Sequence, residues 1–408
     1  MNDYKIKHFE DQLYLKELKL NSLLEITNAI NLNYDVNELV NIYEFIVKEQ
    51  LGLDKFILFN KQENWNCLLK HGVKGKVKNI NIEQELTRFK DITVIASSQS
   101  NIIDEFDTII PVYHKETPLA YLLVTENSNQ NNSNQNEHLN FIQTLTNILT
   151  VAIENKRMAK ISIKQERLKK ELEVAKEMQQ LLFPSDLPSD NRMDISAKYT
   201  PRHEVGGDYY DFIPLGNEEY IICMADVSGK GISAALLMAN FQATIRTIFK
   251  YENFEFEFLL NELNQKVMKN AKGEKFITFF IAHYNANNRK LTYVNAGHNH
   301  PFITSKRNVE MLDKGSIGLG MMDELPFLEI GETTLSPNTT LILYTDGVVE
   351  LENTNEEAFG IDQLVNIAQN YSPLNMEDLN NLVFSKLDEW RGPLKLIDDT
   401  AILSCRFF

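Results

Sequence analysis

The feature that most constrains the fold is a long, unbroken helical pattern in the middle of the chain. No glycine or proline occurs from Leu139 until Pro184, and these two residue types are the strongest helix breakers. The chain has 408 residues, which is too long for one ordinary hydrophobic core. We therefore expect two or three domains, joined by this helix.

Inside the helix, steps of three and four residues connect a row of mostly apolar positions. This heptad seam has about three and a half repeats, just long enough for a coiled coil. It fits a coiled coil between two chains, and equally a single amphipathic helix lying on its own domain. Because the helix joins two domains, we favour a dimeric signalling stalk over residues 151–183, and hence a homodimer. The seam consists of Met158, Ile161, Gln165, Leu168, Leu172, Ala175, Gln179 and Leu182.

The first 150 residues show helices, then strands, then the start of the long helix. Apolar residues at helical spacing predict a helix over 12–30, and a second begins near Asp35, with Glu38 placed for a capping box, and ends near Gly52. The segment 126–138 is rich in Asn, Gln and Ser and predicts a solvated loop. Short β-rich runs lie between them: Phe56–Phe59, Thr93–Ala96, Ile109–Tyr113 and Ala120–Val124.

This order of elements resembles a GAF sensor domain over residues 1–150. The resemblance rests on element order alone and implies an α/β domain that binds a small-molecule or protein signal in a pocket on its sheet. Cys67 and His71 could be ligands there, but an ordinary packed or exposed role is favoured for each.

Composition narrows the function classes. The formal net charge of −16 argues against a nucleic-acid partner; it suits solubility and equally the binding of divalent cations. Three separate cysteines without CxxC spacing argue against disulfides and zinc, and predict buried free thiols at Cys67, Cys223 and Cys405. No apolar run approaches the roughly 18 residues that span a bilayer, and the charged N-terminus lacks a signal sequence. We expect a cytoplasmic protein without membrane contact.

Aspartates recur where strands end in the second half of the chain. They lie in EVGGDYYDF (Glu204–Phe212), MADVSGKGISAALLMA with Asp226, LILYTDGVVE with Asp346, and LIDDTAILSCRF with Asp398 and Asp399. Each segment alone fits a plain turn. If the aspartates of these four segments converged, however, their like charges would repel one another unless a cation neutralised them. Oxygen ligands favour Mg²⁺ or Mn²⁺, and two such ions would activate a water for attack on a phosphate.

Five motifs make a family resemblance specific. EVGGDYYDF, ADVSGKG, NAGHNHP, YTDG and DDTAIL occur in the order and spacing of SpoIIE/RsbU-type PPM phosphatases, over residues 184–408. The resemblance implies an α-β-β-α sandwich with two Mn²⁺ or Mg²⁺ ions, so the predicted fold class of the chain is α+β. It implies that Asp226 bridges both ions, that Asp346 and Asp398 hold one with it, and that Asp208 holds the other with the carbonyl of Val227.

Several residues depart from the pattern or flank it. Ser228 stands where animal-type relatives have a histidine that could protonate the leaving group, so the proton donor is unassigned. In the closing motif Thr400 comes one place early and Ala401 follows, which we interpret as a packing variant. Glu204 and Asp211 are supporting candidates, Asp399 has the weaker claim of its pair, and a structural turn is favoured for His298 and His300. Lys230 could meet a phosphate near the helix N-terminus, but a solvent-facing role is favoured.

The resemblance implies a metal-dependent serine/threonine phosphatase, controlled by its sensor domain. Its substrate would be a phosphorylated regulator of the anti-sigma-factor-antagonist kind. The alternative is a non-catalytic dimeric signalling module. GGDYYDF also resembles the GGDEF motif of diguanylate cyclases, but Tyr209 and Tyr210 depart from it and the later aspartates would be unexplained. The glycine-rich segment 315–320 is expected to be a loop.

Overall fold

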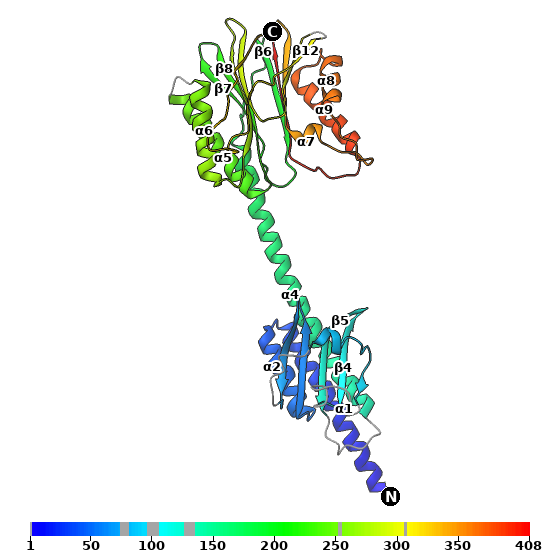
Figure 1. The fold of residues 1–408 in the computed structure, drawn as a ribbon. Coiled ribbons are helices and arrows are strands. Elements are labelled where there is room, and N and C mark those ends of the chain that lie inside the picture. Colours follow the sequence, from blue (N-terminus) through cyan, green and yellow to red (C-terminus); the bar gives the residue numbers. More distant parts are fainter. Residues whose placement is uncertain (1, 74–80, 96–105, 126–134, 252–254, 306–307) are drawn as a thin grey trace. The chain divides into compact units, whose positions relative to one another are not determined.

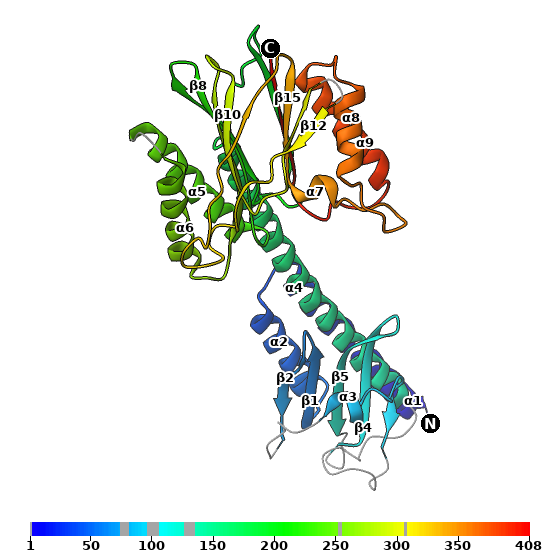
Figure 2. The same ribbon diagram turned by 45° about the horizontal axis from the view of Figure 1, so that its top comes forward.

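The computed structural model describes residues 2–73, 81–95, 106–125, 135–251, 255–305 and 308–408 (Figure 1). The chain forms two compact units, Met1–Glu166 and Arg167–Phe408. Figure 2 shows the same ribbon turned about the horizontal axis, with strands of both units in view.

The N-terminal unit is an antiparallel sheet with helices. Its strands lie in the order β2-β1-β5-β4-β3. The expected succession of helix, helix, strands and long helix is found. The elements are α1 (Asn2–Asn31), α2 (Val36–Phe45) with a π-helical extension (Ile46–Gln50), β1 (Lys55–Lys61), β2 (Trp65–His71), α3 (Ile82–Glu85), β3 (Thr93–Val94), β4 (Thr108–His114), β5 (Thr117–Thr125) and α4 (Gln135–Gln180).

Both faces of this sheet are buried because successive strand residues point to opposite sides. Phe56, Leu58 and Leu122 pack in the cluster that also contains residues of α1, α2 and α4. Ile57 and Leu123 pack on the other face with the α3 segment. The sheet therefore has two hydrophobic layers, one on each side.

Local predictions for this unit were mostly confirmed. The capping box is present: Asp35 Oδ1 accepts from the Glu38 N–H at 2.9 Å, and Glu38 Oε2 accepts from the Asp35 N–H at 2.7 Å. Strand β2 was not predicted, because it is an edge strand with little buried apolar sequence. The expected buried thiol of Cys67 was wrong for the same reason: it lies exposed on β2, whereas Cys223 and Cys405 are buried.

Two predictions touch residues outside the described ranges. Ala96, the expected end of a strand, lies outside them, and so does 126–134 of the expected loop. Residues 135–138 are the first turn of α4, so the loop prediction was wrong there. The reason is that Gln and Glu are good helix formers next to a strong helical pattern.

The long helix α4 changes its surroundings along its length. Met158 and Leu168 of the heptad seam are 54% and 53% exposed, and Ile161 is also exposed. Gln179 is buried, and Leu182, just beyond the helix, packs against the C-terminal unit. The interpretation of a helix lying on its own domain therefore holds only at the C-terminal end of the seam.

The C-terminal unit contains two facing sheets. One has the order β13-β10-β9-β8-β7, with β14 on β10, and the other has the order β12-β11-β15-β16-β6. Its strands are β6 (Met193–Thr200), β7 (Tyr209–Gly216), β8 (Glu219–Val227), β9 (Ile277–Asn285), β10 (Lys290–Ala296), β11 (Phe302–Ser305), β12 (Asn308–Met311), β13 (Gly315–Ser316), β14 (Gly331–Thr334), β15 (Thr339–Tyr344) and β16 (Thr400–Phe407). Its helices are α5 (Ile232–Tyr251), α6 (Phe256–Ala271), α7 (Asp346–Val349), α8 (Ile361–Asn370) and α9 (Met376–Arg391).

Three hydrophobic layers hold this unit together. Residues such as Met224 and Leu403 fill the space between the sheets. Helices α5 and α6 cover the outer face of the first sheet, and α8 and α9 cover that of the second (Figure 1). The unit is therefore the α-β-β-α sandwich that was expected. The 315–320 segment is not wholly a loop, since β13 pairs in parallel with β10.

Helix α5 contains a stretch, Ile232–Phe249, that is long and apolar enough to cross a membrane by length and composition. This differs from the expectation that no segment would qualify. Among its residues, Ala234, Met238, Phe241 and Ile245 are buried in the layer between α5, α6 and the first sheet. This packing accounts for the apolar residues on one side of the helix, whereas Ile232 and Leu236 are exposed.

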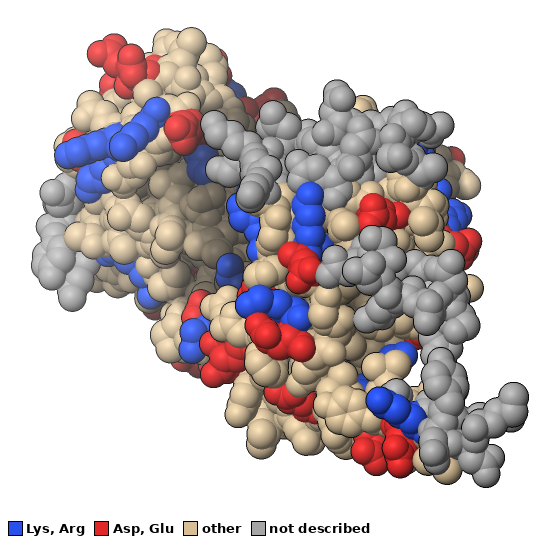
Figure 3. Space-filling view, turned by 90° about the horizontal axis from the view of Figure 1, so that it is seen from below, with Lys and Arg blue, Asp and Glu red and all other residues tan. Residues whose placement is uncertain are grey.

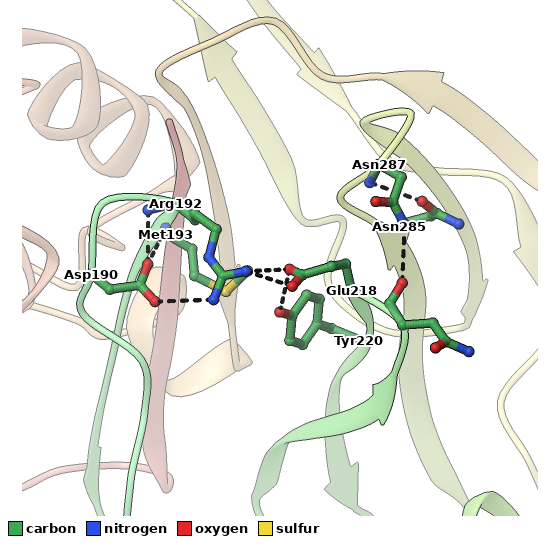
Figure 4. Close-up of polar contacts among 8 residues, drawn as sticks. Asp190, Arg192, Met193, Glu218, Tyr220, Asn285 and Asn287 are labelled. Atoms are coloured by element: carbon green, nitrogen blue, oxygen red, sulfur yellow. Dashed lines mark hydrogen bonds and ion pairs between the residues drawn. The ribbon is translucent and has the colours of Figure 1, made fainter.

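Polar contacts join the two sheets at the end where β7 turns into β8 (Figure 4). Arg192, just before β6, donates from Nη1 to both carboxylate oxygens of Glu218 at 2.6 Å. Asn287 Nδ2 donates to the Asn217 carbonyl at 3.0 Å in the neighbouring turn. These exposed contacts contribute little stability. Figure 3 shows a different face, seen from below Figure 1, on which Lys and Arg are interspersed with Asp and Glu among the described residues.

Candidate metal centre

Two of the predicted ligands come from the first sheet. Asp208 precedes β7, and Asp226 is the penultimate residue of β8. The antiparallel register pairs Tyr209 with Ala225. One step further along this register, Asp208 and Asp226 face each other across the two strands, at the end of the sheet opposite to the β7–β8 turn.

The other two come from the second sheet. Thr345 ties the end of β15 to β16, since its N–H donates to the Ala401 carbonyl at 3.1 Å and its hydroxyl accepts from the Ala401 N–H at 2.9 Å. Asp346 follows directly as the first residue of α7, and Asp398 comes two residues before β16. Because β15 and β16 are paired in this way, Asp346 and Asp398 lie close together at the same end of the sheet.

The electrostatics show that both pairs form one cluster. Burial, followed by the charges of Asp346 and Asp398, raises the pKa of Asp226 to about 7. Burial and then Asp398 raise the pKa of Asp346 to about 6. The pKa of Asp208 is raised well above its ordinary value by burial, then by Asp226 and Asp399. Asp208, Asp226 and Asp346 are thus at least partly removed from water and close enough to other carboxylates to feel their charge.

The donor set fits a divalent cation. All the groups are hard oxygens, which Mg²⁺ and Mn²⁺ prefer. Asp208 is 1% exposed, and its Oδ2 has no hydrogen-bond partner among the described residues, so it is an acceptor that a cation would satisfy. The carbonyl oxygen of Val227 lies close to the loop that carries Asp208. A Cβ built on Gly207 would be 3.0 Å from that oxygen. Within the described ranges no three acidic, imidazole or thiol side chains form a ready-made metal-binding group.

Asp399 organises the loop that leads to Asp208. Its Oδ1 accepts from the Arg202 N–H at 2.8 Å, and its Oδ2 accepts from the Gly207 N–H at 2.7 Å. A Cβ on Gly206 would overlap the Tyr199 hydroxyl and the Asp399 carboxylate, so any larger residue there would displace these side chains. Asp399 therefore supports the site, while Asp398 points to the cluster.

Asp211 also has a supporting position. It is fully buried, and Arg246 of α5 donates to it from Nε at 2.7 Å and from Nη2 at 2.8 Å, while the Tyr209 hydroxyl donates to the same carboxylate. The pair attaches α5 to β7 next to Asp208. Glu204, the other supporting candidate, is exposed on the preceding loop.

Lys230 is exposed, as favoured from the sequence, but it also contacts the cluster. Its Nζ lies 2.7 Å from Asp398 Oδ2 and donates to the Ile397 carbonyl at 2.7 Å. The side chain is 41% exposed, so the ammonium group lies at the rim of the cluster and partly neutralises it. The sequence did place this lysine in the Gly-rich turn after Asp226, but not its contact with the closing motif.

The remaining residues of the motifs make hydrogen bonds to neighbouring segments of the C-terminal unit. Ser228 Oγ accepts from the Phe276 N–H at 2.8 Å. His298 is buried, its Nδ1 lies 2.9 Å from Thr278 Oγ1, and burial lowers its pKa to about 3. A neutral imidazole in this position shapes the turn after β10. His300 is exposed, and its carbonyl accepts from the Tyr344 hydroxyl at 3.0 Å.

Sequence reasoning missed one contact at the edge of the site. Gln179, in the last turn of α4, hydrogen-bonds with the backbone of Gly206. It was recognised only as a polar member of the heptad seam. Its polar side chain interrupts an otherwise apolar row. In the sequence, this was the signal that Gln179 contacts a polar group and not the apolar partner of its neighbours in the row.

The comparisons with known proteins concern the C-terminal unit. A family model described as stage II sporulation protein E (SpoIIE) matches residues 216–408, which begin eight residues after Asp208. Phosphoserine phosphatase RsbU of Bacillus subtilis is 32% identical over 193 residues, covering 47% of this chain and 57% of RsbU. Protein IcfG of Synechocystis is 29% identical, covering 48% of this chain and 35% of IcfG. The chain thus spans about half of the length of RsbU and about a third of IcfG.

A solved structure has the same fold. The SiaA-PP2C domain of Pseudomonas aeruginosa superposes with a TM-score of 0.54 at 21% identity, covering 60% of this chain and 99% of that domain. The C-terminal unit is therefore PP2C-like in fold. Together with the sequence matches, this shows that residues 216–408, somewhat less than half of the chain, are similar to the SpoIIE family and have a PP2C-like fold.

Proposed function

We propose that this protein is a metal-dependent phosphatase that removes phosphate from phosphoserine or phosphothreonine in a regulatory protein. The observation that carries the proposal is the cluster of Asp208, Asp226, Asp346 and Asp398 at one end of the sandwich. Burial and mutual repulsion raise the pKa of three of these carboxyl groups. A fold that keeps such groups together is most easily explained by cations that bind them.

The proposed roles of the residues are those that the family resemblance implies. Asp226, which interacts with Asp208, Asp346 and Asp398, would bridge two ions. Asp346 and Asp398 would hold one ion with it, and Asp208 and the Val227 carbonyl would hold the other. When bound, Mn²⁺ or Mg²⁺ ions supply an activated water and neutralise the charge of the phosphate. The β-strand backbones and the loop held by Asp399 keep these donors in register.

The N-terminal unit is proposed to be a GAF-like sensor, over residues 1–150. Its antiparallel sheet with helices supports this assignment. The proposed linker, residues 151–183, would form a coiled coil between two chains, and the phosphatase domain would occupy residues 184–408. In this arrangement a small-molecule or protein signal would control the phosphatase, in the cytoplasm.

The proposed substrate is a phosphorylated regulator of the anti-sigma-factor-antagonist kind. The similarity to a relative named phosphoserine phosphatase RsbU supports a phosphoprotein substrate. The acidic cluster with a basic residue at its rim suits a phosphate presented on a protein surface, since the cations would reverse the local charge.

The test is hydrolysis of a generic aryl phosphate, and of candidate phosphorylated regulators, by the full chain with Mn²⁺, with Mg²⁺ and with a chelator. Asp226→Asn should lower Mn²⁺-dependent activity by more than about 100-fold, beyond the effect of groups that only orient metal ligands. Asp323→Asn, at an exposed aspartate, is the matched control and should retain wild-type activity. Wild-type protein without activity on any substrate, although it binds its regulator, would support the alternative of a non-catalytic dimeric signalling module.

A further inference from the structure

The ammonium group of Lys230 occupies part of the proposed metal site. Its Nζ is as close to Asp398 Oδ2 as to the Ile397 carbonyl, 2.7 Å in both cases. An ammonium group at this distance uses the carboxylate oxygen that an ion would need.

The turn that carries Lys230 directs it there. Gly229 and Gly231 flank it with φ of +84° and +76°, a region that favours glycine. This left-handed turn connects the end of β8 to α5 and takes the lysine side chain across to the closing motif. The contact therefore joins residues that are far apart in the sequence, from two different sheets.

We propose that Lys230 is a tethered counter-cation of Asp398, which a divalent ion must displace before Asp398 can bind that ion. The side chains of Lys230 and Asp398 are 41% and 34% exposed, and ion pairs at this exposure are weak. The lysine can therefore be displaced by a doubly charged ion without unfolding. In the metal-free protein it limits the repulsion within the cluster; in the metal-bound protein its ammonium group is released at the rim.

Two effects of opposite sign follow when the charge of Lys230 is removed. In the presence of a chelator, Lys230→Gln leaves Asp398 without its counter-charge, so the thermal transition that responds to metal should fall by up to about 4 °C. Mn²⁺ should bind about two- to fivefold more tightly, because it no longer competes with the lysine. A lysine that only stabilised the fold would lower the transition without tightening Mn²⁺ binding.

The experiment is calorimetric titration of the full chain with Mn²⁺ alone, together with thermal unfolding in chelator. Lys230→Arg keeps the charge and should bind Mn²⁺ like the wild type. Lys275→Gln is the matched control. Lys275 donates to the Ser228 carbonyl at 2.9 Å, so this substitution removes one positive charge beside the same turn. It should change Mn²⁺ affinity by less than Lys230→Gln does.

The inference rests on the proposed function, but the two can fail separately. If the wild type binds no Mn²⁺, the proposed metal centre is wrong and Lys230 has nothing to compete with. If the wild type binds Mn²⁺ and Lys230→Gln binds it equally or more weakly, the counter-cation is wrong while the metal centre stands. An equal tightening by Lys275→Gln also overturns it, since the effect would then be general electrostatics.

Discussion

Gln179 and Gly206 exchange two hydrogen bonds. Gln179 Nε2 donates to the Gly206 carbonyl at 2.7 Å, and the Gly206 N–H donates to Gln179 Oε1 at 3.1 Å. Gln179 is 8% exposed in the last turn of α4, and Gly206 lies two residues before Asp208. The end of the long helix is therefore attached directly to the loop that carries one proposed metal ligand.

Gln179→Ala should weaken this attachment. Two buried backbone groups of Gly206 would lose their partner, at a cost of about 1–3 kcal/mol for each group left unsatisfied, before water compensates. Urea unfolding should show a less stable C-terminal unit, and Mn²⁺-dependent activity should fall because Asp208 is held less firmly. Gln180→Ala, at the exposed neighbouring position, is the control and should match the wild type; equal effects of both substitutions would show that only helix propensity is involved.

The stability of the metal-free protein should decrease as pH rises. The folded pKa of Asp226 is about 7 and that of Asp346 about 6, against about 3.9 for an unfolded aspartate. A carboxyl with a raised folded pKa binds protons on folding, so its favourable contribution is present at low pH and is lost between about pH 4 and pH 7. Thermal unfolding in chelator across this range measures the effect.

Metal should reverse the loss. A divalent ion at about 100 times its dissociation constant should raise the metal-responsive transition by about 5–10 °C near pH 7.5. The rise should be smaller near pH 5, where protons compete for the carboxylates. A rise independent of pH would contradict a cluster of mutually repelling aspartates.

Arg246→Ala should destabilise the C-terminal unit. It would leave the fully buried Asp211 carboxylate without its charged partner. Breaking a buried pair costs about 3–5 kcal/mol; because the Arg246 side chain is 45% exposed, we expect about 2–4 kcal/mol. The midpoint of urea unfolding measures this change. Replacing both residues by apolar ones, Arg246→Met with Asp211→Leu, should recover part of the loss, and no recovery would mean that the pair contributes more than charge balance.

Leu168→Glu tests the proposed dimer. Leu168 and Met158 are exposed on the heptad seam of α4, which in a coiled coil would be buried against a second chain. Sedimentation of the full chain should give a dimer, and Leu168→Glu should shift it towards the monomer by placing a charge in the seam. Arg167→Glu, next to the seam, is the control and should leave the dimer intact. A monomeric wild type would exclude the coiled coil at the concentration tested.

Local patterns predicted much of the architecture. The capping box of Asp35 and Glu38, the long helix without glycine or proline, and the strands that end near Asp226 and Asp346 each depend on residues close together in the chain. Edge strand β2 was missed because an exposed strand has little apolar periodicity to detect. The same exposure made the prediction for Cys67 wrong.

By itself, the sequence determined the order of the elements and the positions of the aspartates at strand ends, since propensity, periodicity and motifs act over a few residues. The tertiary structure decided what those aspartates contact. Lys230 with Asp398, Arg246 with Asp211 and Gln179 with Gly206 are pairs between distant segments. Such contacts depend on how the two sheets and their helices pack, and packing brings together side chains whose separation along the chain carries no local signal.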